Sequence, residues 1–180
     1  MLPLQAVSVG PLQAVSVPPM LRSMLQSEYA FLVLFGVFVL EGAMLMYVMP
    51  SELIVPGAIF LLGSDPVTAA LVVGVAVGGA TVGQCALFLV AQRGGREYLL
   101  ERRWVRVSES QLERFDGWFA RWGPVVVPVS NTLLFTRGML TIPAGLAEMD
   151  GRRFALLSAL GTLSFESILA GLYILFDTAL

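Results

Sequence analysis

The stretch VSNTLLFTRGMLTIPAG, residues 129–145, is apolar enough for a membrane, yet it contains Asn131, Arg137 and Pro143. An arginine at the centre of a lipid-facing helix costs about 2.5–3.5 kcal/mol on insertion scales. Proline interrupts a helix interior because it lacks the backbone N–H and clashes with the preceding turn. The stretch therefore predicts a broken segment whose arginine faces protein or a watery cavity rather than lipid.

The composition predicts an all-α integral membrane protein. Of the 180 residues, 57% are hydrophobic and 13% are charged, and the mean hydropathy is +0.80. Soluble domains carry about 25% charged residues, so we expect a multi-pass protein of the cell membrane. The 11 basic residues are all arginine and face 13 acidic residues, which excludes the basic excess of a nucleic-acid-binding protein. The missing lysines indicate genome bias, and a haloarchaeal source is one interpretation.

The residue types also limit the possible chemistry. Histidine is absent and Cys85 is the single cysteine, so neither a disulfide framework nor a metal cluster is expected. The chain has no Ser/His/Asp set and no phosphate-binding loop, so we expect no cofactor and no enzymatic activity. Any proton transfer must use carboxylates.

Three apolar stretches within the chain are candidate membrane spans. They are Tyr29–Met49, which contains Glu41, then Val67–Ala91, which has no charge, and Phe154–Phe176, which is interrupted only by Glu166. A span needs about 20 apolar residues. Two Gly-xxx-Gly spacings in the second stretch, 74/78 and 79/83, favour close helix packing.

We expect one transmembrane domain over residues 28–176, with a flexible leader at 1–27 and a tail at 177–180. The leader contains Pro-Leu-Gln-Ala-Val-Ser-Val twice, at 3–9 and 11–17. Residues 92–123 form an arginine-rich connector, which is typical of the cytoplasmic side. In it, Ser108-x-x-Gln111 has the spacing of a capping box. Leu112, Phe115, Phe119 and Trp122 follow on one helical stripe and predict a short amphipathic helix at the membrane interface.

Two broken segments predict a pseudo-inverted repeat. Residues 124–147 join two cytoplasmic stretches but are too few for two spans, so they are expected to enter the membrane and turn back. If Tyr29–Met49 crosses outward and Val67–Ala91 returns, residues 49–66 dip in from the opposite face. Broken segments at matching positions of two inverted halves point to a transporter's central site. The residues expected to shape these re-entrant helices are Pro50, Pro56, Gly57, Gly138, Pro143 and Gly145.

A set of motifs resembles the DedA family, also called the SNARE-associated or VTT domain. They are Glu41, Pro50-Ser51-Glu52, Pro56-Gly57, Arg121-Trp122-Gly123, Arg137, Pro143-Ala144-Gly145-Leu146 and Met149. The similarity extends from about residue 28 to about residue 176. It implies two opposed re-entrant helices, embedded acids and arginines, and transport of lipids or lipid carriers such as undecaprenyl phosphate, with dependence on the proton gradient.

The resemblance assigns candidate roles by position. Glu41 and Glu52 match the embedded acids and are the expected proton-coupling residues. Arg137 matches the second of two motif arginines, and its guanidinium fork suits a phosphate. Asn131 stands where the family usually has its first arginine, so it is expected to bind phosphate by hydrogen bonds without a charge. Gln84, Gln92, Leu134, Ser158 and Phe165 also depart from the family's usual residues.

The predicted function is transport or flipping of a lipid or polyprenyl-phosphate carrier, with coupling to protons. Its expected partners are membrane lipids and protons, with a homo-oligomer as a further possibility. Two alternatives stay open: proton-coupled transport of a small ion or drug, and a membrane assembly factor that transports nothing. For Glu41, Glu52 and Arg137, a purely structural ion pair is also open.

Overall fold

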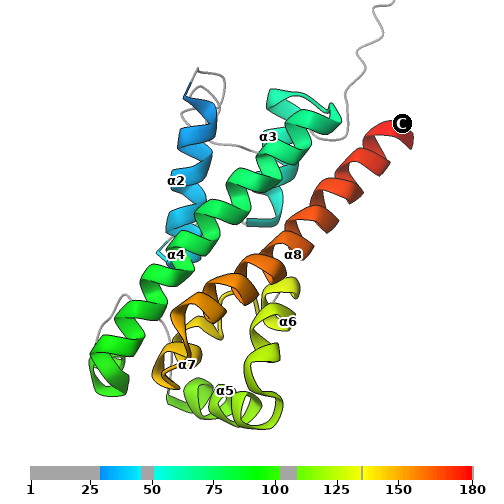
Figure 1. The fold of residues 1–180 in the computed structure, drawn as a ribbon. Coiled ribbons are helices and arrows are strands. Elements are labelled where there is room, and N and C mark those ends of the chain that lie inside the picture. Colours follow the sequence, from blue (N-terminus) through cyan, green and yellow to red (C-terminus); the bar gives the residue numbers. More distant parts are fainter. Residues whose placement is uncertain (1–28, 46–50, 102–108, 135, 180) are drawn as a thin grey trace, which may run out of the picture.

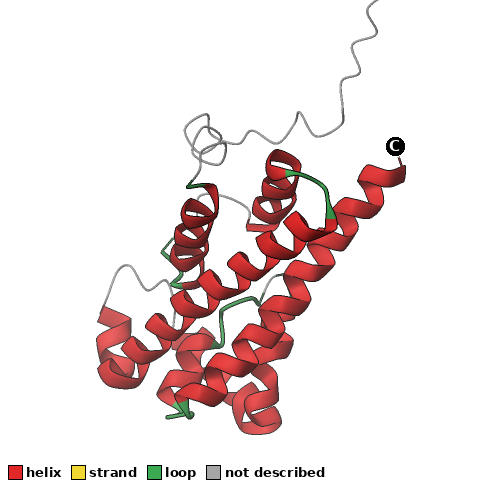
Figure 2. Ribbon diagram, turned by 45° about the horizontal axis from the view of Figure 1, so that its top comes forward, coloured by secondary structure: helices red, strands yellow, loops and turns green. Residues whose placement is uncertain are grey.

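A computed structural model describes residues 29–45, 51–134 except 102–108, and 136–179. The predicted leader at 1–27, Pro50 and Ser108 lie outside these residues. Every regular element in the described part is a helix, and Figure 2 shows no strand there. The elements are α2 (Ala30–Gly42), η2 (Ser51–Leu53), α3 (Ile54–Leu62), α4 (Pro66–Glu101), α5 (Glu109–Trp122), η3 (Gly123–Val125), α6 (Val126–Thr132), α7 (Thr141–Leu146) and α8 (Gly151–Ala179).

Two long helices, α4 and α8, form the axis of the fold and run in opposite directions (Figure 1). The hydroxyls of Ser64 and Tyr173 lie 3.4 Å apart at one end, and Gln92 donates to the Met149 carbonyl at the other. Residues Pro66–Gly95 and Gly151–Thr178 are long and apolar enough to cross a membrane. These two helices contain the second and third predicted spans.

Aspartates begin both long helices. Asp65 Oδ1 accepts hydrogen bonds from the backbone N–H groups of Val67 and Thr68, each at 3.0 Å, and Pro66 occupies the first helical position. Hydrogen bonds from Thr68, through its side chain and its backbone, hold the pKa of Asp65 below its usual value. Asp150 caps α8 in the same way, accepting from Arg153 N at 2.9 Å. Local side-chain chemistry therefore sets where each long helix starts.

The first predicted span is wrong in length. Helix α2 ends at Gly42, and Met44 adopts a positive φ of 58°. Its 13 residues extend about 20 Å at 1.5 Å per residue, less than the ~30 Å of a hydrocarbon core. An apolar run shows that residues avoid water, but it does not show whether they face lipid or protein.

The expected direction of this segment is also wrong, because α2 runs parallel to α4. A Cβ on Gly79 would lie 2.6 Å from the Phe35 carbonyl oxygen, and Gly83 abuts Val39 and Gly42 further along both helices. One predicted Gly-xxx-Gly pair, 79/83, therefore forms the contact with α2. In the other pair, Gly74 faces open space.

The two broken segments occupy related places around the long helices. Val127 packs in a cluster with Phe88 and Phe154, and Asn131 bonds to Gln84 and Ser158, so α6 runs parallel to α8. Each half of the fold thus has a short helix parallel to its long helix, followed by a second short helix that leads back to the start of that long helix. Helices α2 and α6 both end near the middle of the axis (Figure 1).

The prolines expected in the re-entrant helices share a register. Pro56 is the third residue of α3, and Pro143 is the third residue of α7. Proline is tolerated in a first turn because the backbone N–H there has no partner within the helix. Both prolines therefore mark the start of a returning helix, as their matching sequence positions predict.

The amphipathic helix predicted after Ser108 is confirmed as α5, which begins at Glu109. Phe119 packs against the cluster of Phe88, Val127 and Phe154, whereas the side chain of Trp122 is 65% exposed. The predicted stripe therefore does not all face one core.

Candidate functional site

The described charged side chains that lie deepest in the protein meet where the two short-helix pairs turn. Glu41 lies at the end of α2, and Arg137 lies in the turn between α6 and α7. Glu166 lies on α8, 15 residues after Gly151 and 13 before Ala179. The site therefore lies near the centre of the long axis, and it joins residues from both halves of the chain.

Arg137 is held between two carboxylates. Its Nη2 atom lies 2.5 Å from Glu166 Oε1 and 3.5 Å from Glu41 Oε2, where it donates a hydrogen bond. The side chains of Arg137, Glu41 and Glu166 are 6%, 15% and 0% exposed. The guanidinium carbon also lies 4.6 Å from the centre of the Phe165 ring, which is a cation–π distance. The arginine thus has a nearly dry site of fixed geometry.

Part of the guanidinium has no protein partner. The buried Nε and Nη1 atoms of Arg137 make no hydrogen bond with the described residues. Neither oxygen of Glu166 has an aligned hydrogen bond, so its contact with Nη2 is an ion pair only. Buried donors without partners cost free energy, and in a native fold they call for an explanation such as a ligand. These N–H groups suit an anion with several acceptor oxygens.

A neutral polar network supports the turn that carries Arg137. Asn131 Nδ2 donates to Gln84 Oε1 at 3.0 Å and to Ser158 Oγ at 3.2 Å. The Ser158 hydroxyl donates to the same Gln84 oxygen. Asn131 Oδ1 accepts from the backbone N–H of Gly138 at 2.9 Å, and Gly138 has a φ of 72° that favours glycine. The network ties α4, α6 and α8 to the residue next to Arg137.

The predicted site residues therefore have different surroundings. Arg137 and Glu41 are brought together. Asn131 is 2% exposed and both ends of its amide have protein partners, so phosphate binding by Asn131 stays a prediction. Glu52 lies in η2 and is close enough for its charge to repel that of Glu166, but it forms no ion pair with Arg137.

The predicted glycines also differ in their surroundings. A Cβ on Gly145 would lie 2.6 Å from the Phe88 carbonyl oxygen, so α7 packs on α4 through this position. Gly57 has open space around it. Close approach therefore explains Gly145, and nothing in the structure explains Gly57.

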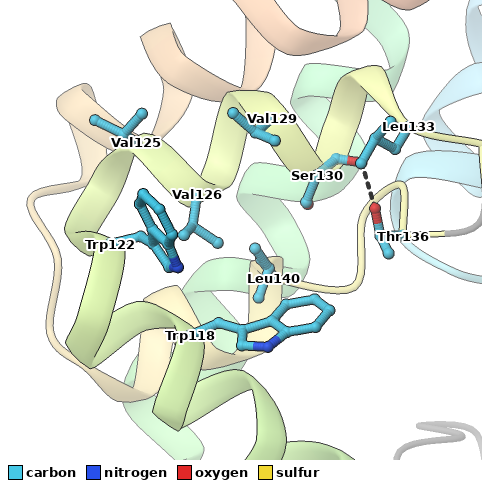
Figure 3. Close-up of a pocket in the computed structure, with 9 residues that line it drawn as sticks. All are labelled: Trp118, Trp122, Val125, Val126, Val129, Ser130, Leu133, Thr136 and Leu140. Atoms are coloured by element: carbon cyan, nitrogen blue, oxygen red, sulfur yellow. Dashed lines mark hydrogen bonds between the residues drawn. The ribbon is translucent and has the colours of Figure 1, made fainter.

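An apolar groove of about 400 Å³ lies beside the same turn (Figure 3). Trp118 and Trp122 of α5 form one wall, and valines of η3 and α6 form another. The lining residues are Trp118, Trp122, Val125, Val126, Val129, Ser130, Leu133, Thr136 and Leu140. Thr136 and Leu140 belong to the turn that carries Arg137. Thr136 donates to the Ser130 carbonyl, while the buried Ser130 hydroxyl has no hydrogen-bond partner among the described residues.

Sequence reasoning gave too little weight to Glu166 and missed the network of Gln84 and Ser158. Glu166 did give a signal, because it is the one charged residue in an apolar run of 23 residues. Such a residue in a membrane helix is a functional candidate by default. Gln84 and Ser158 are neutral and small enough to sit in any apolar helix, so their pairing needed the structure.

In the part of the chain that the structure describes, an all-helical fold with two long apolar helices and a buried ion-pair cluster is typical of an integral membrane protein. The VTT domain family model matches residues 28–173, and the chain belongs to this family, the DedA family of the sequence resemblance. No group of three or more potential metal ligands occurs in the described part of the chain. No solved structure is significantly similar.

Two of three proteins that are similar to this chain have the same name. The chain is 24% identical over 122 residues to undecaprenyl phosphate transporter A of Bacillus subtilis (strain 168), covering 66% of this chain and 61% of that protein. It is 24% identical over 152 residues to the protein of the same name from Staphylococcus aureus (strain NCTC 8325 / PS 47), covering 81% and 74%. It is also 28% identical over 124 residues to the uncharacterized membrane protein YkoX of Bacillus subtilis, covering 68% and 54%. The haloarchaeal source stays a prediction.

Proposed function

We propose that this protein is a multi-pass transporter that moves a phosphate-bearing lipid, of the polyprenyl-phosphate class, across the cell membrane. The observation that carries the proposal is Arg137, a buried arginine near the middle of the fold whose Nε and Nη1 groups lack protein partners. A phosphate offers oxygens to several N–H groups of a guanidinium at once. The names of the relatives from Bacillus and Staphylococcus agree with such a substrate.

The proposed membrane topology has α4 and α8 as spans and the short pairs α2/α3 and α6/α7 as re-entrant hairpins from opposite faces. Three features support it. The short helices are too short to cross, their returning helices start with prolines in the same register, and each hairpin turns near the centre. Irregular backbone at membrane depth needs protein or a cavity around it. Arg137 contacts Glu41 of α2 and Glu166 of α8, and Gly138 lies beside Gln84 of α4.

Charge balance supports coupling to protons. Two carboxylates, those of Glu41 and Glu166, pair with a single arginine, and the charge of Glu52 acts on Glu166. A phosphate that joins this cluster adds negative charge to a poorly solvated place. Adding charge there is costly unless protons arrive with it. In the proposal, Glu41 and Glu52 exchange those protons with the two sides of the membrane.

The groove of Figure 3 favours a lipid over a small ion or drug. Its walls are apolar side chains and two tryptophans, and one end is formed by Thr136 and Leu140, which flank Arg137 in the chain. Tryptophans are enriched where apolar chains meet polar headgroups. A ligand with a phosphate and a long hydrocarbon chain uses both the arginine and the groove.

The test is a flipping assay with purified protein in liposomes that contain a fluorescent polyprenyl phosphate. We expect Arg137→Ala to abolish flipping and Arg137→Lys to weaken it, because lysine offers a point charge rather than a fork. Arg152→Ala is the matched control, since Arg152 is an exposed arginine at the start of α8. Glu41→Gln and Glu52→Gln are expected to remove the acceleration by a proton gradient.

Other results of this assay would favour the alternatives. Leakage of small solutes without lipid flipping would favour a small-ion or drug transporter. If neither lipid nor solute moves in the wild type, an assembly factor is favoured.

A further inference from the structure

We propose that Glu166 is the anion that the substrate phosphate displaces from Arg137, and that Glu166 binds a proton when this happens. The inference rests on the proposed function, because it assigns a second role at the same site. It concerns an acid that neither the family motif nor the names of the relatives point to. The proposed exchange transfers one proton from hydronium in the surrounding water to a Glu166 carboxylate oxygen: one O–H bond of the hydronium breaks, one O–H bond forms on Glu166, and water is left.

The first step of the argument is the position of Glu166. It is the closest carboxylate to Arg137, at 2.5 Å from Nη2, compared with 3.5 Å for Glu41. Its side chain is 0% exposed, whereas that of Glu41 is 15% exposed. A phosphate that forms two parallel hydrogen bonds needs Nη2 together with Nε or Nη1, because Nε and Nη1 do not share an edge of the guanidinium. It therefore competes first with Glu166.

The second step is that Glu166 has no substitute partner. Neither of its oxygens accepts a hydrogen bond from the described residues, and Arg137 is the only cation within salt-bridge distance among them. The other charges that act on it are Glu41 from α2 and Glu52 from η2, and both repel it. Helix α4 carries no charged side chain between Pro66 and Gln92.

The third step is the cost of leaving Glu166 charged. A buried carboxylate that loses its single counter-ion is strongly unfavourable, because neither water nor a donor compensates its charge. A proton removes that cost and leaves a neutral acid. Glu41 differs, because its partial exposure lets water solvate the charge after Arg137 turns away. Phosphate binding is therefore linked to one proton at Glu166.

The experiment measures the affinity of the full chain, in lipid nanodiscs, for farnesyl phosphate between pH 6 and pH 9. The readout is the ratio of the wild-type Kd to the Kd of Glu166→Gln at each pH, because ionisation of the ligand affects both proteins equally. We expect this ratio to rise with pH and to approach a tenfold increase per pH unit once Glu166 of the free protein is charged, since only the wild type must then bind a proton. Asp177→Asn is the matched control, because Asp177 is an exposed acid on the same helix, and the ratio for this variant is expected to stay nearly constant.

A second measurement protects the test against a variant that does not fold. Binding enthalpies measured in two buffers with different ionisation heats give the number of protons taken up on binding. We expect the wild type and the Asp177→Asn control to take up the same number, and a folded Glu166→Gln to take up one proton fewer. A ratio that does not change with pH, or a wild type that takes up no proton beyond those of the ligand, would overturn the inference. Binding that is absent in the wild type at every pH would instead reject the proposed function, and this inference with it.

Discussion

Replacing Asn131 tests whether this residue holds the turn that carries Arg137 in place or binds the substrate phosphate itself. Replacement by alanine removes the acceptor for the Gly138 N–H and the donor to Gln84 and Ser158. A buried donor without a partner costs about 1–3 kcal/mol, and the loss of a buried side chain adds about 1 kcal/mol more. We therefore expect Asn131→Ala to lower the free energy of unfolding by about 2–4 kcal/mol. For a chain of this size that corresponds to a decrease in Tm of roughly 5–15 °C.

The matched control is Ser158→Ala. Gln84 Oε1 keeps its bond from Asn131 in this variant, and the Gly138 N–H keeps its acceptor. The variant loses two hydrogen bonds of the Ser158 hydroxyl, one from Asn131 and one to Gln84, so we expect a loss of about 1–3 kcal/mol, the net value of two hydrogen bonds. Thermal unfolding in detergent, followed by circular dichroism, measures both variants, and farnesyl phosphate binding is measured in parallel.

The reasoning is refuted if Asn131→Ala unfolds at the wild-type temperature but loses ligand binding. Asn131 would then be a direct phosphate ligand, as the sequence resemblance implies, and its bonds to Gly138 and Gln84 would contribute little. A large loss of stability, with binding retained at low temperature, would make Asn131 a residue that positions the turn of Arg137.

Two further predictions concern the topology and the packing. In a Cys85→Ser background, Trp122→Cys and Gly151→Cys are expected to react with a membrane-impermeant reagent from the same side of the membrane, because α6 and α7 together turn back. Asp65→Cys is expected to react from the other side. Labelling of positions 122 and 151 from opposite sides would contradict the hairpin. Gly145→Ala is expected to destabilise the fold by about 1–3 kcal/mol, since its Cβ would lie 2.6 Å from the Phe88 carbonyl oxygen. Gly57→Ala is expected to be neutral or stabilising by up to about 1 kcal/mol, because Gly57 has open space and helical backbone. Equal losses of stability in the two variants would show that close packing on α4 does not explain the effect of Gly145→Ala.

The sequence predicts the elements whose signal is local. Helices α4 and α8 begin at aspartate caps and continue through long apolar runs, so composition and caps suffice to find them. The amphipathic helix α5 follows from its periodicity. The break within residues 129–145 follows from proline and a charge in an apolar run. In each case the physical cause lies within one segment.

The sequence does not predict features that depend on contacts between segments. The end of α2 at Gly42 is not marked by proline, and Glu41 beside it still lies within the helix. The direction of α2 is set by the close approach of its backbone to Gly79 and Gly83. The hydropathy of a sequence does not show whether its helix faces lipid or packs against another helix such as α4. Glu41 is among the acids that the sequence suggests as partners of Arg137, but Glu166 is not, because no local pattern joins it to an arginine 29 residues away.

The incomplete length of α2 and α6 is what allows the site to exist. If either short helix continued across the membrane, the turns that carry Glu41 and Arg137 would lie at a membrane surface, where water screens their charges. Because both helices stop near the middle, their turns face each other beside Glu166, and the ion pairs form in a nearly dry place. Coulomb interactions are several times stronger there than in water, so the charge state of one carboxylate can decide whether an anion binds. The glycines at 79, 83 and 145 allow the close packing of the short helices on α4, and through it they help to fix the geometry of the site.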